Sequence, residues 1–513
     1  MIRTARATMF RSLFACTAFV TAVSSDEARA GDWYVDVGDP GCAGGDGSQG
    51  APFCDIGDAL AVAANGDVIH VEAGNYVELL LIAKSVTISG AGIALTIVDG
   101  NYQGTVLRVT SGTTARLEDL TLAHGDANQG QTYYGGGVHN AGTLTLERVA
   151  VTGCRATNGG GLYNLANLTL SHCAVSDNSA YGYDGGGIKN KSTGTLTMTH
   201  CDVTGNYAYY QGGGISNFGA VDGTYCTISG NSGYTYYGGG VDNHGTIDFD
   251  YVLIVDNRAG GMGGGINNDG GTFVLTNGTV AGNSTWCVGG GVQNSASFVT
   301  HHSIFAGNTA SCLGPDFAGT LDSAGFNLEA DTGATTILGD PTGNQLGVDP
   351  EFVDGAAGDY SLAATSPAID AGDATRSDDL LRDLAGTPRI LDGDLDRTRV
   401  VDLGPFEFSH IRLAVTGTAT PGGALTVTAT GTAGMTAILC VGADDGALLH
   451  PKFGALFVDL STLLLFPLGT LPVAPLNGTI PPSTPLGTTI ALQLLALSGG
   501  AGNFSNPVIL TVE

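Results

Sequence analysis

Apolar side chains recur at a regular interval through the middle of this chain. Each stands three residues before a turn position, and the stretches between them, such as residues 142–146 and 194–198, alternate between apolar and polar side chains. The recurring apolar residues are Val151, Val175, Val203, Ile228, Ile254, Val280 and Phe305. Alternation with a period of two predicts short β-strands with one buried face, and not helices.

A hexapeptide repeat runs in step with these strands. The sequence Gly-Gly-Gly-[Val/Leu/Ile]-x-Asn occurs seven times, and successive copies lie 24 to 27 residues apart. The copies start at Gly135, Gly159, Gly185, Gly212, Gly238, Gly263 and Gly289. A unit of this length cannot bury its apolar face alone, so the units must stack on one another. The pattern predicts a parallel β-solenoid whose successive rungs lie about 4.8 Å apart.

Asparagine occupies the turn position of the repeat. The position is Cys154 in the first copy and Asn178, Asn206, Asn231, Asn257, Asn283 or Asn308 in the others. Asparagine tolerates left-handed backbone and bonds its own main chain, and stacked amides bond along the axis of a β-stack. We therefore interpret these asparagines as structural and not as a catalytic array.

The chain divides into three parts. Residues 1–30 combine early arginines, an apolar stretch and a small-residue ending, which predicts a secretory signal peptide and export to the cell surface, the outer membrane or the medium. No later stretch is long and apolar enough to span a membrane. The solenoid is predicted over residues 31–408, most regular over 135–308 and looser over 314–408. Residues 409–513 alternate as strands around Pro and Gly turns without the repeat, which predicts a small β-sandwich.

The net charge limits the class of partner, and the cysteines suggest disulfides. The formal net charge is −29, which argues against a nucleic-acid partner because nucleic-acid binding relies on basic groups. Cys42 and Cys54 flank a Gly-rich loop and are predicted to form a disulfide, which an exported protein can keep. Cys287 and Cys312 share a column on adjacent rungs, and one rung spacing lies within the Cα range of a disulfide. They are the second predicted pair.

The repeat resembles the polymorphic outer membrane protein repeat and, more broadly, right-handed parallel β-helix proteins of the pectin lyase-like fold. The segment Asp-Val-Ile-His-Val-Glu-Ala-Gly-Asn-Tyr from Asp67 looks like the opening coils of that fold. The sequences Asp-Pro-Glu-Phe at Asp349, Ser-Pro-Ala-Ile-Asp at Ser366 and Val-Asp-Leu-Gly-Pro-Phe-Glu-Phe at Val401 are similar to choice-of-anchor Q end modules. The resemblance implies an all-β, right-handed parallel β-helix in an exported or surface protein, and no particular activity.

Catalytic and metal signals are sparse. The chain lacks the Gly-His-Gly and Arg-x-Lys motifs that sugar-cleaving β-helices of the polygalacturonase type use, and we identify no catalytic residue. Asp392, Asp394 and Asp396 have the alternating acids of a calcium loop, but Leu403 stands where the bidentate glutamate is expected. Calcium is therefore the one cofactor candidate, and a solvated acidic loop is the alternative.

Tyrosines gather in the loops just before the glycine triplets. Stacking of the rungs predicts that they lie along one edge, where aromatic faces form a platform for sugar rings or for a protein partner. The alternative is that they stack on each other and cover loop backbone. The candidate binding residues are Tyr134, Tyr183, Tyr207, Tyr209, Tyr210, Tyr234, Tyr236 and Tyr237. We predict a non-enzymatic binder of a polysaccharide or a surface protein; the alternatives are a polysaccharide lyase or glycoside hydrolase of this fold, and a structural spacer.

Overall fold

The structure, a computed structural model, describes most of the chain after residue 30. The described residues are 31–129, 133–373, 382–387, 389 and 400–409, followed by the C-terminal strands β40 (Ile411–Gly417), β41 (Ala424–Gly431), β42 (Thr436–Gly442), β43 (Asp444–His450), β44 (Gly454–Val458), β45 (Leu464–Thr470), β46 (Leu476–Thr479), β47 (Thr489–Ser498), β48 (Ala501–Phe504) and β49 (Val508–Thr511). The predicted signal peptide and the predicted calcium loop with Asp392, Asp394 and Asp396 lie outside the described residues.

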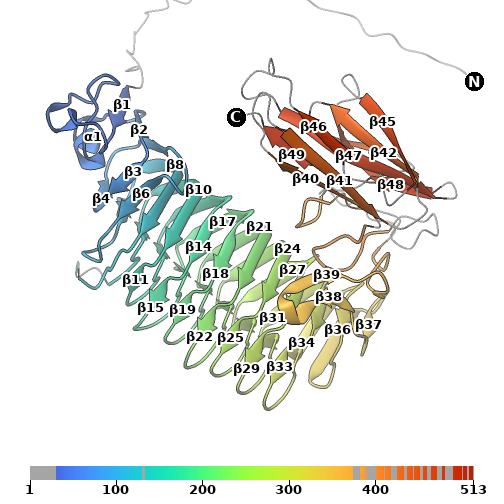
Figure 1. The fold of residues 1–513 in the computed structure, drawn as a ribbon. Helices are drawn as coiled ribbons and strands as arrows, with labels where there is room; N and C mark the ends of the chain where they lie inside the picture. The colour runs from blue at the N-terminus through green and yellow to red at the C-terminus, as the bar shows by residue number, and fades with distance from the viewer. Residues whose placement is uncertain are drawn as a thin grey trace, which may run out of the picture.

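A right-handed parallel β-helix extends from β1 to β37, and its coils follow one another along the axis in Figure 1. Each regular coil contributes a strand to three broad faces and to a narrow edge sheet. The first face is formed by the last three residues of the hexapeptide repeat, the second and third faces by the alternating stretches, and the edge sheet by two-residue strands that precede the tyrosine loops. All of the strand pairs in these sheets are parallel, as the repeat predicts.

The strands of each face are as follows. The first face contains β4 (Leu80–Ile82), β7 (Leu107–Val109), β9 (Val138–Asn140), β12 (Leu162–Asn164), β16 (Ile188–Asn190), β20 (Ile215–Asn217), β23 (Val241–Asn243), β26 (Ile266–Asn268) and β30 (Val292–Asn294). The second face contains β1 (Asp32–Val35), β2 (Val68–Val71), β5 (Thr87–Gly90), β13 (Asn167–Ser171), β17 (Thr195–Thr199), β27 (Thr272–Thr276), β31 (Ser297–His301) and β36 (Thr335–Asp340). The third face contains β3 (Gly74–Tyr76), β6 (Thr96–Asp99), β14 (Ala174–Ser176), β18 (Asp202–Thr204), β28 (Thr279–Ala281), β32 (Ile304–Ala306), β35 (Leu328–Glu329) and β37 (Gln345–Leu346).

Longer strands continue from one face to the next, and the edge sheet stands apart from them. The strands shared by the second and third faces are β8 (Thr114–Ala123), β10 (Thr143–Thr152), β21 (Ala220–Ser229) and β24 (Thr246–Val255), and β34 (Phe317–Ala324) is shared by the first and second. The edge sheet contains β11 (Arg155–Ala156), β15 (Ser179–Ala180), β19 (Tyr207–Ala208), β22 (Ser232–Gly233), β25 (Arg258–Ala259), β29 (Ser284–Thr285) and β33 (Thr309–Ala310).

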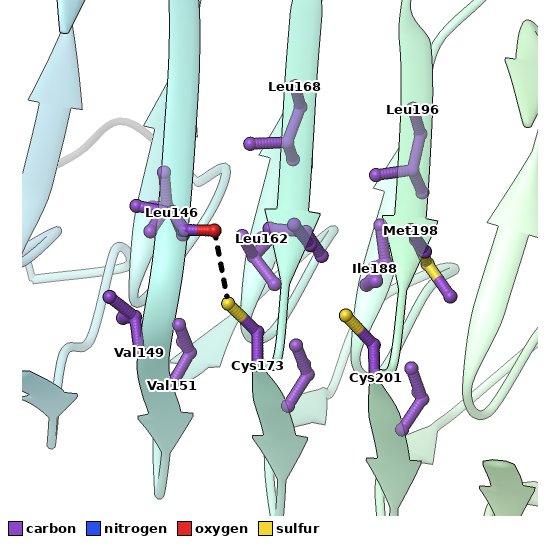
Figure 2. Packing of buried hydrophobic residues seen from close by; sticks show 14 of the residues in the cluster. Leu146, Val149, Val151, Leu162, Leu168, Cys173, Ile188, Leu196, Met198 and Cys201 are labelled. Atoms are coloured by element: carbon purple, nitrogen blue, oxygen red, sulfur yellow. Dashed lines mark hydrogen bonds between the residues drawn. The ribbon is translucent and has the colours of Figure 1, made fainter. Parts of the chain in front are cut away.

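Stacked apolar columns fill the interior. The predicted column from Val151 to Phe305 is confirmed, because each of its members pairs in register with the next one along the axis. Figure 2 shows a second column, in which Leu168 and Leu196 lie on neighbouring strands with Cys173 and Cys201 below them. All of these side chains are buried. Burial of each large aliphatic side chain contributes about 1.5–3 kcal/mol to stability.

Two asparagine ladders follow the axis of the solenoid. The turn-position ladder runs from Asn178 to Asn308 and ends on the carboxylate of Asp316, with amide-to-oxygen distances of 2.9 to 3.1 Å. The hexapeptide ladder runs from Asn140 to Asn294, with distances of 2.8 to 2.9 Å. The side chains of both ladders are buried, which supports the structural interpretation of the repeated asparagines.

A short N-terminal cap covers the first coil. It contains the 3-10 helix η1 (Cys42–Gly44) and the α-helix α1 (Ile56–Val62), whose Ile56 and Ala59 are buried in the same core as the first strands. The carboxylate of Glu78 accepts hydrogen bonds from the backbone N–H groups of Ile56 and Gly57 at 2.8 Å each. These bonds satisfy two of the donors that a helix leaves unpaired at its start.

The last part of the predicted solenoid folds differently from the expectation. Coils end at β37, and the chain then forms an antiparallel hairpin of β38 (Phe352–Asp354) and β39 (Asp359–Leu362) around the 3-10 helix η2 (Gly355–Ala357). Tyr360 of this hairpin packs on the outward side chains of Leu253, Val255 and Ala281, and its hydroxyl donates to Asp256 at 2.7 Å. The looser coils predicted over residues 314–408 therefore end at Leu346. The returning chain packs instead on the outer side of the third face, which is apolar here.

The C-terminal strands pair antiparallel in sheets of their own. One sheet has the order β40-β41-β46, a second has β45-β42-β47-β48 with β49 beside β47, and β43 pairs with β44. This arrangement matches the predicted all-β sandwich, and its strands take no part in the parallel sheets of the solenoid.

Candidate functional site

Loops between the edge sheet and the first face carry most of the predicted binding residues. We call residues 181–184, 207–211 and 234–237 the tyrosine edge. The glycine triplet after each loop fixes its course: Gly212 has a φ of 62°, and a Cβ there would lie 2.6 Å from the carbonyl oxygen of Ile215. Glycine adopts this left-handed conformation without a steric penalty. The loop can therefore turn sharply onto the first face.

Three tyrosines from successive coils form the first tyrosine row. The ring centroids of Tyr183 and Tyr210 lie 5.7 Å apart, and those of Tyr210 and Tyr236 lie 5.4 Å apart, with interplanar angles of 19° and 3°. Rings stacked in this way cover one another's faces within the row. The outward ring edges and the end rings of the row are what a ligand can reach, and 56% of Tyr183 is exposed.

The second tyrosine row lies beside the first. Tyr234 packs against both Tyr207 and Tyr209, at centroid distances of 6.2 and 6.1 Å. Tyr209 joins the two rows, because its ring stands nearly perpendicular to that of Tyr210 at 5.1 Å. The structure thus brings seven of the eight predicted tyrosines together, with Tyr237 in contact with Tyr236 at 5.8 Å.

Tyr134 lies apart from this group. It precedes β9, two coils before Tyr183, and its ring stacks on Tyr163 at 4.6 Å. Tyr163 in turn stacks on His139 at 5.7 Å. Tyr134 therefore covers the first face of an earlier coil and does not extend the tyrosine edge.

An open groove of about 450 Å³ runs along the first row. It is lined by Tyr183, Asp184, Tyr210, Gln211, Tyr236 and Tyr237. Asp184 and Gln211 add polar groups that the sequence analysis missed. Their signal in the sequence is their position directly before a glycine triplet, next to a tyrosine.

A buried lysine holds Asp184 in place. The Lys189 ammonium donates to Asp184 Oδ2 at 2.7 Å and to Ser216 Oγ at 3.0 Å, and it lies 4.0 Å from the centre of the Phe218 ring. Burial lowers the pKa of the Lys189 ammonium, and the charge of Asp184 opposes that shift. The paired charges fix the rotamer of the carboxylate that lines the groove.

The predicted cysteine pairs behave differently from each other. Cys42 and Cys54 form a disulfide with a Cα distance of 4.8 Å. Cys287 and Cys312 are free thiols, which differs from the prediction. Their backbones are at rung distance, since Cys312 N donates to Cys287 O at 2.9 Å. The neighbouring thiol of Cys312 raises the pKa of Cys287.

A group of three aspartates lies on the outer side of the second face. Asp222 and Asp248 pair in register on β21 and β24, and Asp250 follows two residues later on the same side. Partial burial raises the pKa of the Asp248 carboxyl, and the charge of Asp222 adds to the rise. Asp250 accepts a hydrogen bond from Asn277 Nδ2 at 2.9 Å. The sequence signal of this group is weak, because Asp222 and Asp248 become neighbours only when the outward positions of successive repeats are aligned.

Metal and membrane signals are absent from the described part of the chain. Within it, no group of three or more His, Cys, Asp or Glu side chains is arranged to hold a metal ion. Over the same residues, no helix has the length and apolar character needed to cross a bilayer.

Comparison with known proteins finds only distant structural likenesses. No protein-family model matches this chain, and no curated protein does. Three of the similar solved structures are a rhamnogalacturonan lyase (12% identity over 63% of this chain and 91% of that one, TM-score 0.33), XylC in complex with xylose (9%, 63% and 87%, TM-score 0.38) and the pectin methylesterase PemA from Erwinia chrysanthemi (11%, 48% and 78%, TM-score 0.29). The parallel β-helix is established by the strand pairing of the chain itself, and likeness at this level carries no argument about its activity.

Proposed function

We propose that this protein is exported and binds a linear polysaccharide along the tyrosine edge. The observation that carries the proposal is the groove in which tyrosines from three successive coils stand beside Asp184 and Gln211. Aromatic rings with a few fixed polar groups are a common lining of ligand sites. Tyrosine suits this task because its ring is apolar and its hydroxyl can hydrogen bond.

The repeat of the solenoid favours a repeating ligand. Each coil places another tyrosine at nearly the same spacing, 5.7 and then 5.4 Å, so one contact can recur along the groove. Asp184 accepts hydrogen bonds from sugar hydroxyls, and the amide of Gln211 both donates and accepts. The groove is open along the outside of the molecule. A polymer can therefore bind in it by an internal stretch and does not have to enter by a chain end.

Binding is expected to weaken when the first row is removed. Tyr210→Ala should lower affinity for a bound polysaccharide about tenfold, because the middle ring supports both of its neighbours and about 1.4 kcal/mol corresponds to that factor. The triple variant of Tyr183, Tyr210 and Tyr236 to alanine should abolish binding. The measurement is a glycan array on the purified protein, followed by calorimetry with each polymer that binds.

Tyr134→Ala serves as the matched control. This tyrosine is 40% exposed and precedes the same kind of glycine triplet, but it lies outside the groove. It should leave affinity unchanged. Full binding by the triple variant, with an unchanged melting temperature, would show that the rings only cover loop backbone.

A second candidate function is polysaccharide cleavage at Asp222 and Asp248. Glycosidases use two carboxyl groups about 5 to 9.5 Å apart, and side chains on adjacent rungs start from a separation of about 4.8 Å. The raised pKa of the Asp248 carboxyl suits the role of a general acid. These features favour hydrolysis over the lyase alternative.

Cleavage is tested by following new reducing ends from each polymer that binds. Asp248→Asn should lower the rate at least about 100-fold, the low end of what general acid–base catalysis contributes. Asp202→Asn, at an exposed aspartate of β18 on the third face, should leave the rate unchanged. If the unaltered protein releases no products, this second candidate is wrong and the binding proposal is untouched.

A further inference from the structure

A second, smaller cavity lies farther along the same edge of the solenoid. It has a volume of about 140 Å³ and is lined by Ser232, Gly233, Tyr234, Arg258, Gly260 and Trp286. We call it the aromatic slot. Its two aromatic walls are each 63% exposed. Tyr234 belongs to the second tyrosine row, so the slot continues the tyrosine edge toward the C-terminal coils.

The slot exists because one coil lacks an aromatic side chain. The position directly after each edge strand is Tyr181, Tyr209, Tyr234, Gly260 and Trp286 in five successive coils. Gly260 approaches the carbonyl oxygen of Tyr234 so closely that a Cβ would lie 1.8 Å from it. No other residue fits here without a backbone shift, and the coil between Tyr234 and Trp286 therefore leaves the space between the two rings free.

The two aromatic walls are attached far enough apart to admit a ring between them. Tyr234 and Trp286 are attached two rungs apart, about 10 Å along the axis. A ring held between two aromatic faces needs carbon contacts of about 3.5–4.0 Å on each side. Two such contacts need about 7–8 Å, so one puckered sugar ring can be accommodated within this span. Neighbouring coils leave no such space, because Tyr209 and Tyr234 already lie 6.1 Å apart.

Arg258 supplies a positive charge inside the slot. Its guanidinium carbon lies 5.7 Å from the centre of the Trp286 ring. Arg116 and Arg148 lie against Glu118, Glu147 and Asp119 in ion pairs. Arg258 forms no ion pair with a carboxylate among the described residues. An exposed guanidinium with free donors is suited to bind an acidic group.

We propose that the aromatic slot binds one acidic sugar residue of a polysaccharide, with its ring between Tyr234 and Trp286 and its charged group on Arg258. This inference rests on the proposed polysaccharide binding and adds the class of sugar. The charged group is a carboxylate or a sulfate ester, since a guanidinium pairs with either. In a chain with a net charge of −29, a local arginine is what makes an acidic ligand acceptable at this position.

The test compares three polymers on the full chain: alginate, which carries carboxylates, dextran sulfate, which carries sulfate esters, and uncharged dextran. Trp286 is one of only two tryptophans, and the other, Trp33, packs on Phe53 in the N-terminal cap. The part of the fluorescence change that is lost in Trp286→Ala therefore reports on the slot. We expect alginate or dextran sulfate to change the fluorescence and to bind at least tenfold more tightly than dextran.

Arg258→Gln should remove this preference and lower the affinity for the acidic polymer about tenfold. Arg155→Gln is the matched control, because Arg155 occupies the same column of the edge sheet, is exposed and also stacks on an aromatic ring, that of Tyr102 at 4.5 Å. It should change nothing. Trp286→Ala should lower the affinity for the acidic polymer by a similar factor.

Three outcomes overturn the inference. They are equal affinity for dextran and the acidic polymers, equal effects of Arg258→Gln and Arg155→Gln, and unchanged binding by Trp286→Ala. The proposed function fails separately, when the triple variant of Tyr183, Tyr210 and Tyr236 binds every polymer like the unaltered protein. Circular dichroism and melting of each variant confirm that the solenoid is folded before binding is compared.

Discussion

Replacing Asn231 with alanine should lower the free energy of unfolding by about 3 kcal/mol. Asn231 Oδ1 accepts from the backbone N–H and the amide of Asn206, and its Nδ2 donates to the carbonyl of Val203 and to Asn257. Alanine removes the partner of the backbone N–H of Asn206 and one hydrogen bond each from the Asn206 amide, the Val203 carbonyl and the Asn257 amide oxygen. Each buried group left unsatisfied costs about 1–3 kcal/mol. Relaxation around the smaller side chain recovers part of the sum.

Urea denaturation measures the effect, and hydrogen exchange localises it. Because each coil of a solenoid contacts only its neighbours, the backbone N–H of Asn206 should exchange faster while distant coils keep their protection. Asn75→Ala is the control, since Asn75 is exposed on β3, and it should change stability by less than about 0.5 kcal/mol. An equally small change for Asn231→Ala would mean that the ladder bonds contribute nothing net.

Raising the pH from 5 to 8 should destabilise the end of the solenoid by about 2–3 kcal/mol through Glu329. Burial raises the pKa of this carboxyl to about 7, from an ordinary value of 4.5. The folded state therefore holds a proton more tightly than the unfolded state. Its contribution is fully present below pH 4.5 and is lost as the pH rises through 7, at about 1.4 kcal/mol for each unit of pKa difference.

Asp383 acts in the same direction. It lies in the chain that returns onto the third face, and burial raises its pKa to about 6. Glu329→Gln should flatten the pH dependence, because the amide cannot ionise, and most of the gain in stability should occur at pH 8. Glu72→Gln, at an exposed carboxyl of an early coil, should leave the difference between pH 5 and pH 8 as it was. An unchanged pH profile in Glu329→Gln would mean that another group causes the pH dependence of stability.

The regular coils follow from the sequence in detail. Val151, Val175 and Val203 were aligned by spacing alone, and they pair in register because each rung repeats the environment of the one before. The same holds for the asparagine ladders, where one amide bonds the next. A column is a local pattern repeated along one axis, so the period of the sequence is sufficient to place its members.

The C-terminal end of the solenoid is less predictable from the sequence. The outward positions of β24 lose their polar character, since Leu253 and Val255 are buried there, whereas the outward Thr227 and Ser229 of β21 are only partly covered. This loss of alternation is the sequence signal of the returning chain. It shows that something covers the third face, but it does not name the partner, because the hairpin that supplies Tyr360 is 104 residues away.

The sequence by itself determined the β-helix, the inward columns and the structural role of the asparagines, because these depend on a period and on side chains that meet their own repeats. Tertiary structure decided which exposed groups meet. Rotamers and loop courses divided the tyrosines into two rows, fixed Asp184 on the buried Lys189 and opened the slot between Tyr234 and Trp286. Exposed side chains have no repeating environment that fixes their direction, so spacing alone could place them on an edge but could not build the site.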